Sequence, residues 1–248
     1  MVYGIIAAGA GSRLRADGFQ GFKPMVQIAG ETLIQRLIRI FQANNASSIY
    51  IILNNAEIEV GQFIESLPNP AGTPIKILYK DTPSSFHSFY ALADKMAPED
   101  QSAVCISTID PVFREEAFKG YIDAFKQQKE LDGLMAVTSY VEDDKPLHVY
   151  IDPDFKITKF ASDPLPGQPW ISGGIYLFRN KALQVAETAM QAQVSKMRNY
   201  QQALLNAGLH LKAYDLGRII DIDHVSDIAL AKALLENNLA KREGFGIK

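Results

Sequence analysis

Cysteine is almost absent from this 248-residue chain, which has a single one, Cys105. One cysteine cannot form a disulfide within the chain, so a disulfide framework is excluded. Cys105 lies in the apolar run Ala103-Val104-Cys105-Ile106, where a buried small side chain is favoured over a reactive thiol. We expect a reducing, cytoplasmic location.

Long apolar segments are also missing. No run approaches the roughly 20 residues that a membrane-spanning helix needs. Residues 1–8 are apolar, but they have no basic flank and lead directly into Gly9-Ala10-Gly11. This pattern is typical of a first buried strand and not of a signal peptide. We therefore expect no membrane partner.

Blocks of basic residues and paired histidines are missing too. The formal net charge is −3 and the sequence pI is about 5.8, which argues against nucleic acid as the main partner. The four histidines are scattered, and no two of them have metal-ligand spacing. The sequence has no convincing His or Cys catalytic motif, which fits a reaction that needs no general base.

What the chain does have is alternation of strand-like and helix-like segments. Buried strands are predicted at 2–7, 48–53, 75–79, 103–107 and 134–141, and helices at 32–43 (capped by Thr32), 57–67, 84–96 and 115–129. Further strands are predicted at 148–151, 156–160, 171–178, 211–214 and 218–220, with helices at 181–190, 199–207 and 225–238. We predict one α/β domain over 1–248, a Rossmann-like three-layer α/β/α sandwich with a mostly parallel sheet and a small antiparallel extension.

A glycine-containing loop follows the first predicted strand. Small residues there let a phosphate approach the backbone N–H groups, and Arg13 adds a permanent positive charge. Lys23 comes ten residues later as a second cation. Leu14 breaks a dinucleotide fingerprint and Ala10 breaks a Walker loop. The glycines alone are equally consistent with a tight turn, but together with both cations they predict a nucleotide phosphate site at Ala7, Ala8, Gly9, Ala10, Gly11, Ser12 and Arg13.

The segment from Ile6 to Leu14, followed by Lys23-Pro24-Met25, resembles the signature of the nucleotide-sugar pyrophosphorylase-like nucleotidyltransferases, which include MobA-like NTP transferases. One departure is Phe22, where the family usually has proline. The resemblance implies the nucleotide-diphospho-sugar transferase fold, an NTP substrate, and Mg²⁺ as cofactor. It also implies that Arg13 and Lys23 are catalytic. Residues 1–141 would form the nucleotide-binding half and 142–248 the acceptor-binding half.

Acidic residues follow two of the predicted strands. The resemblance implies that Asp110, Asp221 and Asp223 bind the metal, and carboxylates are ligands that Mg²⁺ prefers. Asp110 precedes Pro111 and could instead begin a turn. Asp223 or Ser226 could instead cap the last helix, whose first turn Asp227 is expected to favour.

Two further segments match positions where related enzymes hold the base and the acceptor. Ser84, Ser85 and Ser88 are candidates for contact with the nucleobase, although Ser84 could only cap a helix. The acceptor candidates are Trp170, Ser172, Gly173 and Gly174, and the glycines are equally consistent with a bulge in a core strand. The segment 161–164 lacks the lysine of hexose-type enzymes, which leaves smaller phosphorylated alcohols open.

These patterns predict an enzyme that transfers a nucleoside monophosphate from an NTP to a phosphorylated sugar or small alcohol and releases pyrophosphate. CTP and UTP are the expected nucleotides, by resemblance. The alternatives are a glycosyltransferase that consumes a nucleotide-sugar and a silent nucleotide-binding regulatory module. A glycosyltransferase commonly has Asp-x-Asp, and Thr108 occupies the first of those positions. Assembly into a homo-oligomer stays open.

Overall fold

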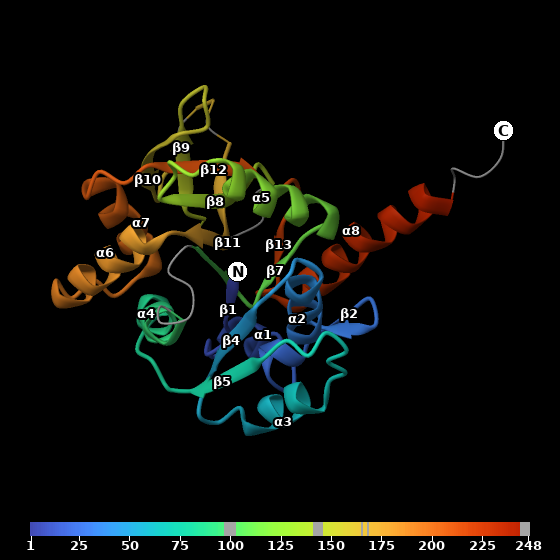
Figure 1. Cartoon of the computed structure of the whole chain (residues 1–248). Helices are drawn as coiled ribbons and strands as arrows, with labels where there is room; N and C mark the ends of the chain where they lie inside the picture. The colour runs from blue at the N-terminus through green and yellow to red at the C-terminus, as the bar shows by residue number, and fades with distance from the viewer. Residues whose placement is uncertain (97–102, 141–145, 165, 168, 244–248) are drawn as a thin grey trace.

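The computed structural model describes residues 1–96, 103–140, 146–164, 166, 167 and 169–243. Its centre is a nine-stranded sheet in the order β10-β9-β11-β6-β1-β4-β5, with β8 and β12 joined to it through β11 (Figure 1). One half is parallel and consists of β1 (Val2–Ile6), β4 (Ser48–Leu53), β5 (Ile75–Tyr79) and β6 (Val104–Thr108). The carboxyl ends of these strands therefore lie along one edge of the sheet.

The other half is organised around one reversed strand. β11 (Ile171–Phe178) is antiparallel to β6 and to β8 (Gly133–Thr138), and β12 (Leu211–Asp215) is parallel to β8. β9 (His148–Ile151) and β10 (Ile157–Ala161) form the predicted antiparallel extension. The expected mostly parallel sheet with a small antiparallel part is confirmed.

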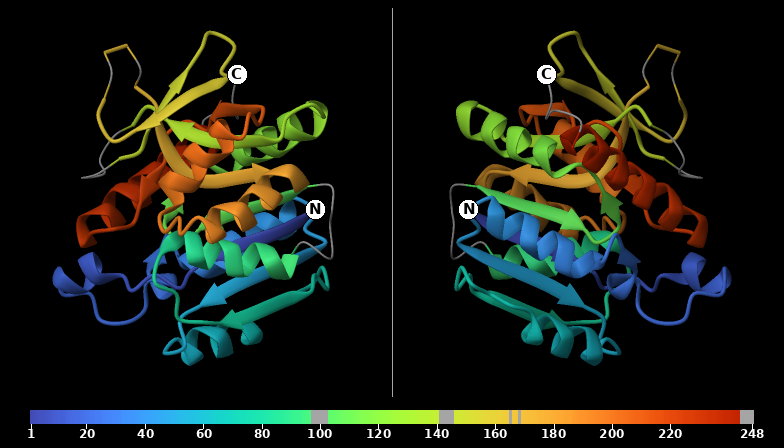
Figure 2. Two further views of the ribbon diagram at one scale, coloured as in Figure 1. Left: turned by 90° about the vertical axis from the view of Figure 1, so that its left-hand side faces the viewer. Right: turned by 90° about the vertical axis from the view of Figure 1, so that its right-hand side faces the viewer.

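Helices cover both faces of the sheet, as the two views of Figure 2 show. One layer contains α2 (Leu33–Ala43), α3 (Ile58–Ser66), α5 (Glu115–Gln127) and α8 (Val225–Glu243), and the other contains α4 (Ser85–Met96), α6 (Asn180–Gln191) and α7 (Met197–Asn206). Side chains alternate along β1, so Tyr3 and Ile5 pack under the first layer while Val2 and Ile6 pack under the second. The three-layer architecture is thus dictated by two apolar faces on each central strand.

Most predicted elements have the expected bounds to within a few residues. Thr32 caps α2 as predicted, because its hydroxyl accepts the Gln35 N–H at 3.2 Å, and Cys105 is fully buried. The last strand, predicted at 218–220, is instead β13 (Ile220–Asp221). Residue 141, the end of the strand predicted at 134–141, lies outside the described residues. None of the helices in the described ranges is long and apolar enough to cross a membrane.

Several short elements were not predicted, because two to five residues are too few to show a periodic pattern of apolar side chains. They are α1 (Ser12–Ala16), the 3₁₀ helix η1 (Lys23–Met25), the pair β2 (Gln27–Ile28) and β3 (Glu31–Thr32), and β7 (Pro111–Val112), which pairs with β13. The β7–β13 pair brings the end of the chain back to the centre. Asp221 lies opposite Pro111, and the Ile222 N–H donates to the Asp110 carbonyl at 3.1 Å.

Candidate functional site

A cavity of about 450 Å³ lies at the carboxyl edge of the parallel strands. Its walls come from the loops after β1, β4, β5 and β6, which is the usual position of a ligand in an open parallel sheet. The predicted nucleotide-binding residues that line it are Ala8, Gly9, Ala10, Gly11, Ser12, Arg13, Ser84, Ser85 and Ser88. Ala7 lies behind the cavity, fully buried, and its N–H extends the sheet by donating to Ile52.

The glycine loop presents its backbone to this cavity. A Cβ built on Gly9 meets nothing within 4 Å, whereas Gly11 has a φ of +58° and begins α1. Only glycine adopts that φ without strain, so Gly11 sets the turn while Gly9 leaves open space above the loop. Arg15 donates to the Ala10 carbonyl and helps to hold the loop's shape.

Lys23 is buried between two carboxylates. Its Nζ lies 2.8 Å from Asp110 Oδ2 and 3.0 Å from Asp223 Oδ1, and its side chain is only 8% exposed. Burial opposes the charged form, but the two carboxylates overcome it and raise the pKa of Lys23 to about 12. Burial also opposes ionisation of Asp110, yet the Lys23 ammonium holds the pKa of that carboxyl below its usual value. The three side chains form a charged cluster at the cavity floor.

The predicted metal ligands do not converge as a set of three. Across the part of the chain that the structure describes, no three His, Cys, Asp or Glu side chains cluster to hold a metal ion. Asp110 and Asp223 face each other across the Lys23 ammonium. One or two carboxylates are what Mg²⁺ usually takes from a protein when phosphate oxygens and waters complete its shell, so this donor set fits magnesium bound with a nucleotide.

The acidic residues near the start of α8 have separate roles. Asp227 Oδ2 accepts the backbone N–H groups of Asp223 at 2.9 Å and His224 at 2.6 Å, so Asp227 reaches back from the first turn of α8 to the two residues that precede it. Asp223 turns its own carboxylate to Lys23 and to Arg13 instead. The alternative in which Asp223 is the helix cap is therefore wrong.

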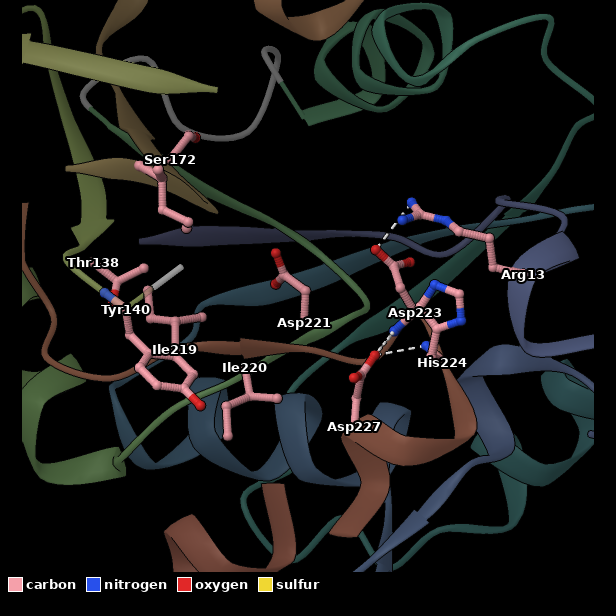
Figure 3. A pocket seen from close by; sticks show the side chains of 12 residues that line it. Arg13, Thr138, Tyr140, Ser172, Ile219, Ile220, Asp221, Asp223, His224 and Asp227 are labelled. Carbon is pink, nitrogen blue, oxygen red and sulfur yellow. Dashed lines mark hydrogen bonds and ion pairs between the residues drawn. The ribbon is translucent and has the colours of Figure 1, made fainter. Parts of the chain in front are cut away.

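Figure 3 shows the residues that line a second, smaller cavity of about 30 Å³. Asp221 points into it, and Thr138, Tyr140 and Ile219 form its opposite wall. Arg13 and Asp223 line both cavities, and their side chains form an ion pair of 3.0 Å. The two cavities therefore meet at the Arg13–Asp223 pair.

The predicted acceptor residues divide into two groups. Ser172 and Gly173 line the small cavity, but Trp170 packs on Phe155, with ring centroids 5.7 Å apart, and lines neither cavity. A Cβ on Gly174 would lie 2.6 Å from Thr108 Oγ1, and the φ of Gly174 is +71°. The pairing of β11 with β8 shifts register between Ser172 and Tyr176. The glycine pair thus forms a bulge required by the protein's own packing.

The serines after β5 are tied together on the far wall of the larger cavity. Ser84 Oγ lies 2.8 Å from His87 Nδ1 and also bonds to the Ser195 carbonyl, and Ser88 Oγ lies 2.5 Å from Thr82 Oγ1. The Ser84 carbonyl accepts the Ser88 N–H at 3.1 Å, so Ser84 stands directly before the first turn of α4, and its role as a helix cap or a base contact stays a prediction. Ser84, Ser85 and Ser88 all line the larger cavity.

Sequence reasoning missed several lining residues. Tyr140 forms part of the small cavity, and the Arg218 guanidinium stacks on its ring with 3.7 Å between the charge and the ring centroid. Asn54, after β4, lines the large cavity. Asn54 could have been found, because it follows a predicted parallel strand, but Tyr140 and Arg218 belong to no motif.

Comparison with known proteins identifies the family of this chain. The family model of the MobA-like NTP transferase domain matches residues 4–202. A curated relative is the "Bifunctional IPC transferase and DIPP synthase" of Rubrobacter xylanophilus, 23% identical over 244 residues. That match covers 93% of this chain and 51% of the relative, so the chain spans about half of the relative's length.

Solved structures share the fold. The inositol-1-phosphate CTP transferase from T. maritima has a TM-score of 0.76 and 17% identity, covering 94% of this chain and 95% of that chain. A putative glucose-1-phosphate thymidylyltransferase from Bacillus anthracis has a TM-score of 0.79 and 18% identity, covering 94% of each chain. The fold and the recognised signature are confirmed, and this chain is a nucleotidyltransferase domain that belongs to the MobA-like NTP transferase family.

Proposed function

We propose that this chain transfers a nucleoside monophosphate from CTP or UTP to the phosphate of a small phosphorylated sugar or alcohol and releases pyrophosphate. The observation that supports this most strongly is the junction of two cavities at Arg13 and Asp223, with Lys23 buried beside them. One cavity has the size and backbone donors for a nucleotide. The other begins where the α-phosphate of that nucleotide would lie.

On the nucleotide side, the loop from Ala8 to Arg13 receives the triphosphate. Its backbone N–H groups donate to phosphate oxygens, while the Arg13 guanidinium is placed to pair with them. Ser84, Ser85 and Ser88 lie on the opposite wall, where the base would be held. Arg13 and Lys23 supply fixed positive charge, which stabilises the negative charge that develops at phosphorus in the transition state.

Asp110 and Asp223 would hold the magnesium ion, with Asp221 at the edge of the acceptor cavity beside them. Bound Mg²⁺ would offset phosphate charge and favour departure of pyrophosphate. Lys23 is then free to turn from the carboxylates toward the phosphates. This role for the acidic residues rests on their fit to magnesium and on their position in the cavity floor.

The reaction itself needs little acid–base chemistry. An oxygen of the acceptor's phosphate attacks the α-phosphorus, forming a new P–O bond while the bond from the α-phosphorus to the bridging oxygen breaks and pyrophosphate leaves. A phosphate monoester has a second pKa near ~6 and is already largely anionic at neutral pH. Positioning of the two substrates would therefore supply much of the rate.

A phosphorylated cyclic alcohol is the acceptor that we favour, with CTP as the nucleotide. The curated relative is named an IPC transferase, and one similar solved structure is named an inositol-1-phosphate CTP transferase. The segment 161–164 has no lysine for a hexose 1-phosphate. The small cavity of about 30 Å³ would enclose only part of such an acceptor, whose hydroxyl groups Ser172, Asp221 and Tyr140 would contact.

The experiment is a measurement of pyrophosphate release with Mg²⁺ from each of the four NTPs against a panel of acceptors. The panel includes inositol phosphate, choline phosphate, and hexose, heptose and amino-sugar 1-phosphates. Release that needs one NTP and one acceptor establishes the reaction and its substrates. Nucleotide binding without release from any acceptor favours the regulatory alternative, and consumption of a nucleotide-sugar without pyrophosphate favours a glycosyltransferase.

A further inference from the structure

Asp17, at the end of α1, is bonded to the beginning of α8. Its Oδ2 accepts the backbone N–H of Val225 at 3.1 Å and lies 2.9 Å from His224 Nδ1. Val225 is the first residue of α8, so its N–H has no partner inside the helix. A carboxylate from near the start of the chain thus occupies the N-terminus of its last helix.

This contact is the second of two that join α1 to the segment from Asp221 to the start of α8. Arg13 and Asp17 are one turn apart on α1, since the Asp17 N–H donates to the Arg13 carbonyl at 3.0 Å. Arg13 pairs with Asp223, and Asp17 pairs with Val225 two residues later. Asp17 and Val225 line neither of the two cavities, so a bound nucleotide would leave the bond between them in place.

We propose that Asp17 is a positioning residue that keeps the glycine loop attached to the Asp221–Asp223 segment while Arg13 exchanges Asp223 for nucleotide phosphates. The inference rests on the proposed function, which requires Arg13 to leave Asp223. Once that ion pair opens, the Asp17 bonds maintain the distance between the loop and the acidic residues. Asp17 acts through Arg13 and touches no reacting atom.

A role for Asp17 as a helix cap alone is a weaker explanation. Asp227 accepts the N–H groups of Asp223 and His224, the two residues before α8, so this end of the helix already has one carboxylate. Asp17 and His224 have side chains that are 34% and 37% exposed, and exposed charged pairs contribute little to stability. The contact's main consequence is therefore the placement of α1 and not the stability of α8.

The first test compares Asp17→Ala with Asp17→Asn. The alanine removes both bonds, whereas the asparagine oxygen still accepts the Val225 N–H. We expect Asp17→Ala to raise the Kd of the Mg²⁺–NTP complex about tenfold, the size of one lost hydrogen bond to a charged group. Asp17→Asn should raise it less than threefold, and the KM for the acceptor should stay within twofold in both variants. Equal effects of the two substitutions, or no effect of either, would overturn the proposal.

A second variant removes the same bond from the other side. Val225→Pro deletes the N–H that Asp17 accepts, at a helix position where proline is tolerated because its φ already suits the first turn. Since Val225 is 41% exposed, the change removes little packing. We expect Val225→Pro to weaken nucleotide binding as Asp17→Ala does, and binding as tight as that of the unmodified protein would contradict the proposal.

A double-mutant cycle separates positioning from general damage. If Asp17 acts through Arg13, Asp17→Ala should change the nucleotide Kd less than twofold in an Arg13→Ala background. An undiminished tenfold effect in that background would mean that Asp17 does not act through Arg13.

Hydrogen exchange makes the test independent of turnover. The Arg15 and Asp17 amides close α1 on Gly11 and Arg13, and they should exchange about tenfold faster in Asp17→Ala than in the unmodified protein. If these two amides exchanged at the same rate in Asp17→Ala as in the unmodified protein, the proposed role of Asp17 would be wrong even if nucleotide binding fell. If the unmodified protein bound no nucleotide at all, the proposed function would fail, while the exchange rates would still decide whether Asp17 positions α1.

Discussion

Arg13 Nη2 lies 3.0 Å from Asp223 Oδ2, and this ion pair stands where the nucleotide cavity meets the smaller cavity. The Arg13 side chain is 48% exposed, so solvent screens much of the attraction and the pair opens at low cost. A nucleotide phosphate offers the guanidinium a stronger, bidentate partner. Binding is therefore expected to break the Arg13–Asp223 pair and to release Asp223 for a metal ion.

The first prediction concerns Arg13. Arg13→Ala should lower kcat/KM for the NTP about 10²-fold, because it removes a fixed cation from the phosphates. The free energy of unfolding should change by less than about 1 kcal/mol, since the lost ion pair is half exposed. Steady-state pyrophosphate release and urea unfolding measure the two quantities. Arg198→Ala removes a half-buried arginine that lines neither cavity and should leave kcat/KM within twofold.

The second prediction concerns cation binding by the nucleotide-free protein. Lys23 Nζ occupies the space between Asp110 and Asp223, so it competes with any divalent ion for those carboxylates. Lys23→Met should bind Mn²⁺ at least tenfold more tightly than the unmodified protein, as measured by electron paramagnetic resonance, while turnover falls about 10²–10³-fold.

Lys119→Met is the matched control for that substitution. Lys119 pairs with Asp123 on an exposed face of α5, and its loss should alter neither Mn²⁺ binding nor turnover. Mn²⁺ affinity that is unchanged or weaker in Lys23→Met would show that the carboxylates hold no cation in place of the ammonium.

The fold could be predicted from the sequence because its long elements carry their own periodicity. Buried runs such as 48–53 and amphipathic stretches such as 33–43 are set by local pattern, and they have nearly the predicted bounds. Asp110 was found for the same reason, since it follows a buried strand of a parallel sheet and must lie at its carboxyl edge.

The contacts that assemble the site could not be predicted, because they join residues far apart in the chain. Lys23 meets Asp223 and Asp17 meets Val225 only after β13 pairs with β7, and a two-residue strand shows no period. The bulge at Gly173 and Gly174 depends on the positions of Ile219 and Thr108 on other elements. The placement of Trp170 away from the cavities was equally beyond local pattern.

The third prediction concerns pH and Glu57. Glu57 is 4% exposed, and burial raises the pKa of its carboxyl to about 7 despite the Asn54 N–H and Arg15, which lower it. The folded protein therefore holds this proton more tightly than the unfolded chain does. Between the unfolded value of 4.5 and about 7 the unfolded state loses the proton first, so stability falls as pH rises through this window.

Glu57→Gln should abolish that part of the pH dependence. The amide oxygen still accepts the Asn54 N–H, and no charge is buried above pH 7. We expect the variant to exceed the unmodified protein by about 2 kcal/mol in free energy of unfolding at pH 8 and to match it near pH 4.5. Glu59→Gln, at an exposed position in the first turn of α3, should stay within about 0.5 kcal/mol at both pH values. A difference for Glu57→Gln that does not vary with pH would contradict the assignment.

The last prediction separates two glycines that the sequence alone treats alike. Gly9→Ala places a methyl group into open space above the loop, so stability should change by less than about 1 kcal/mol. The same methyl group occupies the volume that a phosphate needs, and nucleotide affinity should fall about 10- to 100-fold. Gly174→Ala forces a left-handed φ of +71° on a side chain 2.6 Å from Thr108 Oγ1 and should cost about 2 to 4 kcal/mol of stability. Urea unfolding and nucleotide titration of both variants test this division. Unchanged nucleotide affinity in a folded Gly9→Ala variant would mean that the phosphates do not lie over the loop.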